Sequence, residues 1–548
     1  MTRAAELAHH VRFTTSYMVR ALTTDPAWLV LQAARRLPAR TSASVVPWVE
    51  RVVGDGTRGE AGRLRAAWAA GDVTTVRACV PRSRTGRRVR AALLGQIGTL
   101  DPIRTSTARV GAPRAAGPTH QVAVHHHLTN SLPHTQSGYT LRTHAILTAL
   151  RAAGHQVTAT TRAGYPLTIG ALGARRTDTV DGVRYDRLLP RSWPADHHRR
   201  AAAEAALLTD VLARNRPDIL HATTPWTTGE TVRAAAERAG LPWVYEVRGL
   251  PEETWAASHA TAAEREAATR SERYALVRAK ETELALAADQ VVTLSTTMRK
   301  ELIARGVPSG RITVVPNAVD DELLDAAVPS PAQARTMLGL RTAPRVIGTV
   351  SSLVGYEGAD TILRTVATLR DGGTDVSALV VGDGVARPGL LRLAAELGIA
   401  EHVLLPGRVP RDVARTYLAA LDVVLVPRRP HPVTSLVTPL KPVEAMATRR
   451  PVVASDLPAL REACSPLDGG APAALLVPAD DHTAWVDAVG GLLDDRARRD
   501  DLVAAGRDVA ADRTWSRLVA RYDTVYAAAS GTAAPASPAA TTNRKDSR

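Results

Sequence analysis

From residue 119 onward the chain alternates short apolar segments with longer helical patterns, and no other feature constrains its fold as strongly. A first series of predicted strands lies at residues 121–126, 156–161, 219–222, 243–247, 291–294 and 313–315. A second series lies at residues 345–350, 378–381, 403–405 and 423–426. Strands that alternate with helices form parallel sheets covered by helices, and ligands bind beyond the carboxyl ends of such strands. The sequence therefore predicts an α/β protein with two Rossmann-like domains in tandem.

The length of 548 residues is too great for a single hydrophobic core. We divide the chain into a basic, mostly α-helical extension with its linker at 1–118, a first α/β domain at 119–325, a second at 326–512, a C-terminal helix at 513–530 and a tail at 531–548. The linker and the tail are rich in Ala, Pro and Thr, a composition typical of segments without a packed core.

The positive charge is concentrated in the extension. The net charge is +15, and residues 1–118 carry 19 Arg against 7 Asp and Glu. The densest patch comprises Arg82, Arg84, Arg87, Arg88 and Arg90. Two interpretations remain open: the extension binds an anionic membrane surface, or it is a solvated helical domain. Aromatic residues are scarce among these arginines, so nucleic acid is not an expected partner.

The chain is expected to reside in the cytoplasm, either free or peripheral on the inner face of the cell membrane. Two cysteines, Cys79 and Cys464, provide neither a disulfide framework nor a structural zinc site, which fits a reducing compartment. No apolar run has membrane-spanning length. No metal or other cofactor is expected, because the adjacent His125, His126 and His127 point to alternating faces of a strand and no Asp-x-Asp pair is present. We expect His127 to line a cleft at the end of its strand.

The segment TPLKPVEAMA, which starts at Thr438, predicts a nucleotide site. Thr438 is the expected N-cap and Pro439 the expected first helical residue. The backbone N–H groups of Leu440 and Lys441 would then face an anion, and the Lys441 ammonium adds a full positive charge. Glu444, one turn further, can accept hydrogen bonds from two ribose hydroxyls. The alternative is an ordinary surface helix with an ion-paired glutamate.

Two loops that follow predicted strands are further candidates for phosphate or acceptor binding. Ser137-Gly138 opens a helix after the first strand and allows close backbone approach of an anion. Gly382 and Gly384 form a tight turn in VVGDG, although the chain lacks a complete Gly-x-Gly-x-x-Gly pattern there. A plain connecting loop is the alternative at both places.

Arginines at strand ends are the remaining candidates. Glu246 and Arg248 share one face at the end of a strand, either as site residues or as a structural ion pair. Arg428 and Arg429 end the fourth strand of the second series, where they could neutralise a diphosphate or remain a solvated pair.

From about residue 120 to 529 the chain resembles the family 4 retaining glycosyltransferases of GT-B fold, and within them the branch associated with exopolysaccharide and exosortase gene systems. The resemblance rests on several motifs in the same order: SLPHTQSGYTLRTHAI, YEVRGLPEETW, ITVVPNAVD, GYEGADTIL, VVGDG, LPGRVP, VPRRPHPV, LVTPLKPVEAMA and RPVVASDLPALRE. It implies two Rossmann-like domains that face a cleft, with the acceptor bound by the first domain and the nucleotide-sugar by the second. It also implies that the last helix crosses back to the first domain.

The resemblance assigns roles to four of the candidates. Ser137 and Gly138 fall on the family's acceptor-side glycine loop. Glu444 falls on the second glutamate of the E-x7-E pattern, which holds the ribose, and Arg248 falls where many members have a catalytic-site histidine.

Three positions depart from the family. The first glutamate of E-x7-E falls on Leu436, and the usual arginine and lysine for the diphosphate fall on Ser352 and Glu357. We expect Arg428 or Arg429, together with Lys441, to replace the missing basic pair, because a departing diphosphate needs compensating charge.

The expected activity is metal-independent transfer of a sugar, with retained configuration, from a UDP- or GDP-sugar to a cell-surface, exopolysaccharide or lipid-linked acceptor. Arg248, Lys441, Arg428 and Arg429 are the expected catalytic groups. A non-catalytic glycosyltransferase-like partner in a polysaccharide assembly complex remains the alternative because of the three departures.

Overall fold

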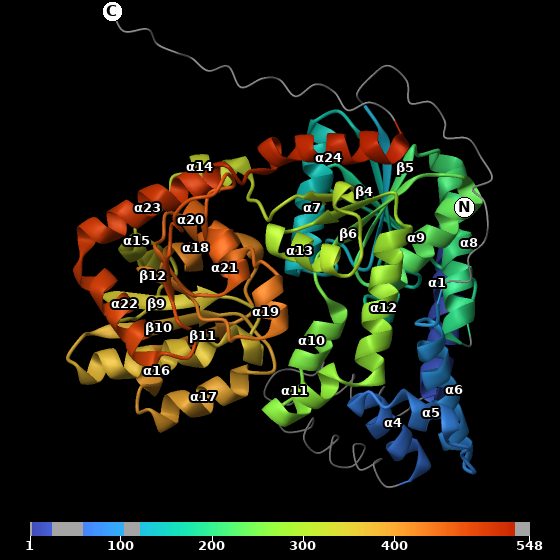
Figure 1. Ribbon diagram of the computed structural model, residues 1–548, viewed down its shortest axis with the longest axis horizontal. Helices are drawn as coiled ribbons and strands as arrows, with labels where there is room; N and C mark the ends of the chain where they lie inside the picture. The colour runs from blue at the N-terminus through green and yellow to red at the C-terminus, as the bar shows by residue number, and fades with distance from the viewer. Residues whose placement is uncertain (1–2, 25–58, 103–120, 195, 532–548) are drawn as a thin grey trace, which may run out of the picture.

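The computed structural model describes residues 3–24, 59–102, 121–194 and 196–531. Within them, two largely parallel sheets are each covered by helices, and a group of helices from the N-terminal part of the chain packs against the first sheet domain (Figure 1). This confirms the predicted fold class. The predicted tail beyond residue 531 and most of the predicted linker lie outside the described residues.

The first sheet has eight strands in the order β3-β4-β2-β1-β5-β6-β7-β8. Their bounds are β1 Ala123–Leu128, β2 Gln156–Thr161, β3 Thr177–Val180, β4 Val183–Arg187, β5 Ile219–Thr223, β6 Trp243–Val247, β7 Gln290–Thr293 and β8 Ile312–Val314. Its helices are α7 Gly138–Ala152, α8 His197–Asn215, α9 Trp226–Ala239, α10 Pro251–Ala257, α11 Ala262–Thr269, α12 Glu272–Ala287 and α13 Thr296–Ala304, with short 3₁₀ turns at Leu167–Ile169 and Ser309–Arg311. Every residue of β5 and β6 is buried, as expected for central parallel strands covered on both faces.

One element of this sheet was not predicted from the sequence. Strands β3 and β4 form an antiparallel hairpin at the sheet edge. Its turn contains Asp181 and Gly182, both with positive φ (47° and 74°). The dipeptide Asp-Gly is a strong signal for a tight hairpin turn, so the sequence carried the information.

The second sheet has six parallel strands in the order β11-β10-β9-β12-β13-β14. Their bounds are β9 Arg345–Val350, β10 Val376–Val381, β11 Val403–Gly407, β12 Val423–Val426, β13 Val452–Ser455 and β14 Leu475–Val477. Its helices are α14 Asp321–Asp325, α15 Pro331–Met337, α16 Ala359–Asp371, α17 Arg387–Glu396, α18 Arg411–Ala419, α19 Pro432–Leu436, α20 Lys441–Ala447, α21 Pro458–Cys464, α22 His482–Asp494 and α23 Arg496–Ala511, with 3₁₀ turns at Gly355–Glu357 and Ala400–His402.

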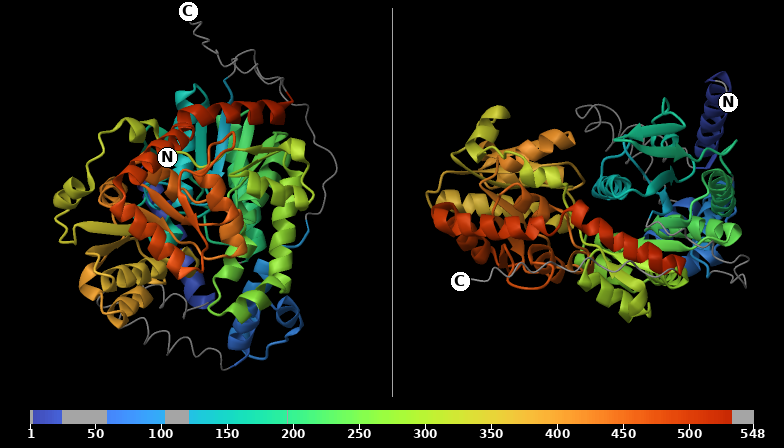
Figure 2. Two further views of the ribbon diagram at one scale, coloured as in Figure 1. Left: turned by 60° about the vertical axis from the view of Figure 1, so that its left-hand side comes forward. Right: turned by 90° about the horizontal axis from the view of Figure 1, so that it is seen from above.

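The last helix, α24 Trp515–Ser530, leaves the second domain and runs along the first (Figures 1 and 2). Its buried face, which includes Trp515, Tyr522 and Tyr526, belongs to the same hydrophobic cluster as Val124 of β1 and Val244 of β6. Burying large aromatic side chains contributes several kcal/mol of stabilisation. The chain therefore joins the two domains twice.

The N-terminal helices are α1 Arg3–Thr24, α4 Glu60–Ala70, α5 Val73–Ala78 and α6 Arg84–Gly98. Helices α4, α5 and α6 enclose a small hydrophobic core of their own, formed by Leu64, Val73, Val76, Val89, Leu93 and Ile97. Helix α1 buries Phe13 against Leu167 and Leu189 of the first domain. Among the described helices, none combines the length and apolar character needed to cross a lipid bilayer.

Candidate active site

A cavity of about 250 Å³ lies between the two domains, beyond the carboxyl ends of β9 and β10. Lys441, Glu444 and Gly382 line it from the second domain, and Ser137 and Gly138 line it from the first. The structure therefore brings five of the predicted site residues around one space. Its location agrees with the rule that ligands of parallel sheets bind beyond the carboxyl ends of the strands.

The glycine turn after β10 is dictated by close backbone packing. Gly382 and Gly384 have φ of 137° and 158°, and an added Cβ would lie 1.7 Å from the Ser351 carbonyl oxygen and 2.2 Å from the Leu353 carbonyl oxygen, respectively. No side chain fits at either place. Gly382 borders the cavity, whereas Gly384 is not among its lining residues and serves the turn.

The predicted start of the helix that carries Glu444 was wrong. Helix α20 begins at Lys441, its N-cap is Leu440, and Pro442 lies in its first turn. Thr438 is not the cap, and its buried hydroxyl has no hydrogen-bond partner in the structure. Instead, Asn317 Nδ2 donates to the Thr438 carbonyl oxygen at 2.9 Å, which ties this loop to the first domain. Neither Thr438 nor Leu440 lines the cavity between the two domains.

Lys441 and Arg428 converge on one carboxylate, that of Glu357. Lys441 Nζ lies 2.6 Å from Glu357 Oε2, and Arg428 Nη2 lies 3.2 Å from Oε1. Burial would raise the pKa of Glu357, but the two cations outweigh it and lower this pKa to about 2. Arg428 also donates to the Val437 carbonyl oxygen at 2.8 Å, so it holds the loop before α20. Arg429 is separate from this cluster: it pairs with Asp360 at 2.7 Å and is half exposed.

Glu444 differs from the other acids at this site because, among the described residues, none donates a hydrogen bond to its carboxylate. Burial raises its pKa. Arg411 and Arg415, one turn apart on α18, line the same cavity, and each pairs with Asp320 at 3.1 Å. These two arginines were not identified from the sequence. Their spacing of four residues, which places them on one face of a helix, was the available signal.

A second cavity of about 520 Å³ lies in the first domain, beyond the carboxyl ends of β1, β5 and β6. Ser137 lines both cavities, so they adjoin at the start of α7. Tyr139, Trp226 and Trp255 give the second cavity an aromatic wall, and Arg248 adds a cation to it. The two tryptophans were not identified from the sequence.

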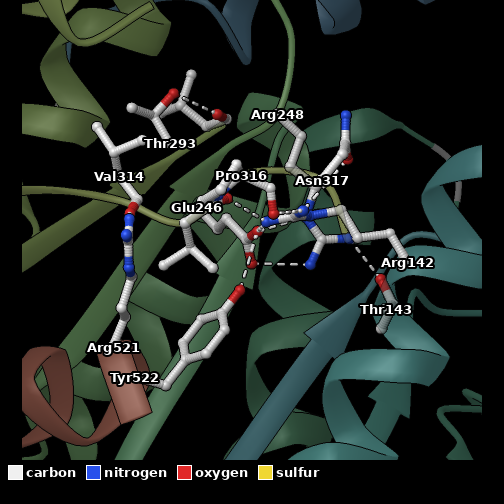
Figure 3. A network of polar contacts seen from close by, with 12 residues as sticks. Arg142, Thr143, Glu246, Arg248, Thr293, Val314, Pro316, Asn317, Arg521 and Tyr522 are labelled. Atoms are coloured by element: carbon white, nitrogen blue, oxygen red, sulfur yellow. Dashed lines mark hydrogen bonds and ion pairs between the residues drawn. The ribbon is translucent and has the colours of Figure 1, made fainter. Parts of the chain in front are cut away.

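Arg248 belongs to a buried network centred on Glu246 (Figure 3). Arg248 Nη2 donates to Glu246 Oε2 at 2.8 Å, and Arg142 Nη2 donates to Oε1 at 2.9 Å. Burial would raise the pKa of Glu246, but Arg248, Arg142 and His221 lower it well below its usual value. Burial in turn lowers the pKa of His221. One carboxylate therefore faces two guanidinium groups, which leaves an excess positive charge beside the second cavity. None of the described residues accepts a hydrogen bond from Nε of Arg248.

His127 does not line either cavity, which corrects our expectation for it. It is buried, its Nδ1 lies 2.9 Å from Thr160 Oγ1, and its Nε2 lies 2.9 Å from Glu204 Oε1. These bonds satisfy the ring inside the domain, as is usual for buried polar groups. Among the described residues, no three histidine, cysteine, aspartate or glutamate side chains are grouped so that they could hold a metal ion.

The chain has two domains, each built on a largely parallel sheet, with a cavity between them. Comparison with known proteins identifies the family. The glycosyl transferase 4-like domain matches residues 137–318, and the glycosyl transferases group 1 domain matches residues 344–495. The chain is 30% identical over 322 residues to a D-inositol 3-phosphate glycosyltransferase of Thermobispora bispora, covering 57% of this chain and 70% of that protein. The chain belongs to the family 4 glycosyltransferases of GT-B fold.

Other comparisons agree with this family. A D-inositol 3-phosphate glycosyltransferase of Nocardia farcinica is 32% identical over 282 residues, which cover 50% of this chain and 58% of the relative's length. Sucrose-phosphate synthase from Thermosynechococcus elongatus superimposes with a TM-score of 0.59 at 20% identity, over 74% of this chain and 98% of that one. HepE of Anabaena, solved in complex with UDP, gives a TM-score of 0.55 at 16% identity over 73% and 98%. These two structures share the fold.

Proposed function

We propose that this protein transfers a sugar from a nucleoside diphosphate sugar, with UDP or GDP as the leaving group, to an acceptor bound in the adjoining aromatic cavity. The observation that carries the proposal is that Ser137 lines both cavities. A donor bound between the domains would therefore face an acceptor held in the first domain. Several relatives are named D-inositol 3-phosphate glycosyltransferase, one is a GDP-mannose-dependent phosphatidylinositol monomannoside mannosyltransferase and one a 2-deoxystreptamine glucosyltransferase.

The donor nucleotide is assigned to the cavity that contains Glu444 and Lys441. The Glu444 side chain is half-buried, none of the described residues donates a hydrogen bond to its carboxylate, and the two hydroxyls of a ribose would supply the missing donors. Lys441 lines this cavity and is the cation assigned to the diphosphate. Arg428 does not line it, but it shares the Glu357 carboxylate with Lys441 and adds positive charge behind it. The leaving diphosphate gains charge in the transition state, so cations placed there in advance stabilise that state.

Arg248 supports the reaction from the acceptor side. Its guanidinium borders the aromatic cavity, and the network around Glu246 leaves an excess positive charge there. This charge favours anionic groups on the acceptor or on the leaving diphosphate. The resemblance described above implies a front-face route with retained configuration, which requires no protein nucleophile and no metal ion.

The acceptor is proposed to be a glycan or a lipid-linked glycan of the cell surface or of an exopolysaccharide, met at the inner face of the cell membrane. The basic extension would contribute through its exposed arginines, which would attract anionic lipid. Flotation of the purified protein with phosphatidylglycerol vesicles, compared with phosphatidylcholine vesicles, tests this at physiological salt. Equal recovery with both vesicle types would remove the membrane role.

Isothermal titration with UDP, GDP and ADP tests the donor assignment. Glu444→Ala should weaken binding of the preferred nucleotide by about 10-fold to 100-fold, because hydrogen bonds to a charged group contribute about 1.5–3 kcal/mol. Glu401→Ala, which removes an exposed carboxylate outside the cavity, is the matched control. Equal affinities for the two variants would refute the ribose role.

One observation favours the alternative of a non-catalytic partner protein: the Lys441 and Arg428 charges are already partly neutralised by Glu357. Product analysis distinguishes the two. Release of nucleoside diphosphate from UDP-sugars or GDP-sugars by the purified protein, lost in Lys441→Ala, supports the enzyme. Nucleotide binding with no release, under conditions where acceptor extracts are supplied, supports the partner.

A further inference from the structure

Two tryptophans in the wall of the aromatic cavity are contacted from behind by the N-terminal helices. Trp255, on α10, and Trp226, the first residue of α9, both line this cavity. Trp226 contacts Thr99, just after α6, and Trp255 shares the Arg273 guanidinium with Trp68 of α4. Neither matched family domain includes this part of the chain. Figure 1 shows α4 and α5 beside the lower end of α12.

Trp255 is held through a stack of three side chains. The Arg273 guanidinium carbon lies 4.5 Å from the centre of the Trp255 ring and 4.3 Å from the centre of the Trp68 ring, so the cation is held between two indoles. Among the described residues, Arg273 has no carboxylate at ion-pair distance, and burial lowers its pKa to about 10. The guanidinium is stabilised by the two aromatic faces and by the Trp68 carbonyl oxygen, to which Nη1 donates at 3.3 Å. The orientation of Trp255 therefore depends on Trp68.

Backbone contacts and close packing hold the turn after α4 against the residues around this stack. Arg273 N donates to the Gly71 carbonyl oxygen at 3.1 Å, and His259 Nε2 lies 3.2 Å from the Ala69 carbonyl oxygen. Gly71 has φ of 83°, and a Cβ on it would lie 2.3 Å from Ser271 Oγ and 2.9 Å from the Trp255 ring. The turn after α4 thus requires glycine for both conformation and space.

Trp226 is held by a different helix of the same group. Its indole Nε1 lies 3.3 Å from Thr99 Oγ1, just after α6, while its backbone N donates to Glu281 at 2.7 Å. Near this contact, Lys280 Nζ donates to the Asp101 carbonyl oxygen at 3.0 Å. The extension thus contacts the cavity wall at two separated points, through residues that are far apart in the sequence.

We propose that helices α4–α6 are a working part of the acceptor site, in which Trp68 and Thr99 act as positioning residues for the Trp255 and Trp226 indoles. The proposal rests on the proposed function in one respect: it takes the aromatic cavity as the acceptor site. Indole faces are flat, apolar and electron-rich, and they pack against the C–H faces of a sugar ring or an apolar chain. The extension therefore sets which acceptor fits, while donor binding in the other cavity is independent of it.

Fluorine NMR of the full-length protein labelled with 5-fluorotryptophan tests the contact directly. The chain has nine tryptophans, and Trp255→Phe and Trp226→Phe assign the two relevant resonances. Trp68→Leu should shift and broaden the Trp255 resonance, and Trp68→Phe, which keeps an aromatic face, should restore it in part. Thr99→Val removes one hydroxyl and should shift the Trp226 resonance.

Trp193→Leu is the matched control. Trp193 also joins the extension to the first domain, lying 5.7 Å from Phe13 of α1 between ring centres and 4.8 Å from the Arg200 guanidinium carbon, but it does not line the cavity. It should leave the Trp255 and Trp226 resonances in place. In transfer assays, Trp68→Leu should raise the KM for the acceptor and leave the KM for the nucleotide-sugar unchanged.

The outcomes separate this proposal from the proposed donor site. Unchanged Trp255 and Trp226 resonances in Trp68→Leu and Thr99→Val, or equal changes in Trp193→Leu, would overturn the positioning role. The UDP-induced rise in melting temperature should be the same in all these variants and in the unaltered protein. Its absence from the unaltered protein would refute UDP as the donor nucleotide and leave the NMR result standing.

Discussion

Replacing Glu357 by glutamine should strengthen binding of UDP while destabilising the unliganded protein. The substitution keeps the shape of the side chain but removes the negative charge, and the amide oxygen can accept from only one of Lys441 and Arg428. In the unliganded protein those cations then lose their counterion, which lowers stability. A bound diphosphate replaces that counterion, and the original carboxylate no longer repels it.

The distances set the size of the effect. Glu357 Oε2 lies 2.6 Å from Lys441 Nζ. A phosphate oxygen bound on the opposite side of Nζ would lie about 5 Å from the carboxylate, where two unit charges repel by about 3 kcal/mol at an effective dielectric constant of about 20 and by about 0.8 kcal/mol in water. Because the Glu357 side chain is only 11% exposed, we take the upper part of this range. The expected gain in UDP affinity, for a repulsion of about 2–3 kcal/mol, is therefore about 30-fold to 100-fold.

Isothermal titration with UDP at 50 mM and 300 mM salt measures this gain, and thermal unfolding measures the loss of stability. The gain should be smaller at high salt, because mobile ions screen part of the repulsion. Asp360→Asn is the matched control: it removes the partner of Arg429, in the same part of the domain, but Asp360 does not line the cavity. UDP affinity that is unchanged or weaker in Glu357→Gln would refute the placement of the diphosphate beside Lys441.

Three further predictions concern the surroundings of the two cavities. Burial raises the pKa of Glu281 from 4.5 to about 8. Between these pH values the folded state binds more protons than the unfolded state. The free energy of unfolding should therefore fall by up to about 1.4 kcal/mol per pH unit as the pH rises from 4.5 to 8. Urea titrations at pH 5.5 and 8 should show this decline to be smaller in Glu281→Gln, and parallel profiles would contradict it. Gly71→Ala should lower the free energy of unfolding by about 1–3 kcal/mol more than Gly306→Ala, because both have positive φ but only Gly71 lacks space for a Cβ. Asn317→Ala should weaken UDP binding several-fold in calorimetry, because the loop before α20 loses its hydrogen bond to the first domain; unchanged affinity would show that this loop does not depend on it.

The sheets could be predicted from the sequence because strands buried on both faces are continuous apolar runs, which stand out between helical segments. The start of α20 could not. Pro439 and Pro442 both suit the first turn of a helix, and local preference does not choose between them. The structure uses Pro442, since Asn317 and Arg428 hold the Thr438 and Val437 carbonyl oxygens in the preceding loop.

The ion pair between Lys441 and Glu357 could not be predicted from local sequence either. Lys441 and Glu357 are 84 residues apart in the chain, and only the parallel arrangement of β9 and β12 brings their loops together. The sequence did indicate that a basic residue was needed near the diphosphate and that Glu357 departs from the family pattern. It could not indicate that the departing residue and its proposed substitute would bind each other.

That pairing clarifies how a transferase of this family could keep a diphosphate site after losing the usual basic residue on one loop. The requirement is for positive charge at a point in space, and Lys441 on α20 can supply it to the same cavity. The loop that presents Lys441 is then fixed from three sides: by Glu357, by Arg428, and by Asn317. Asn317 in turn accepts from Arg142, which binds Glu246. The loop before α20 and the buried network beside the aromatic cavity therefore belong to one chain of hydrogen bonds. A shift of either domain at Asn317 should alter the surroundings of both cavities.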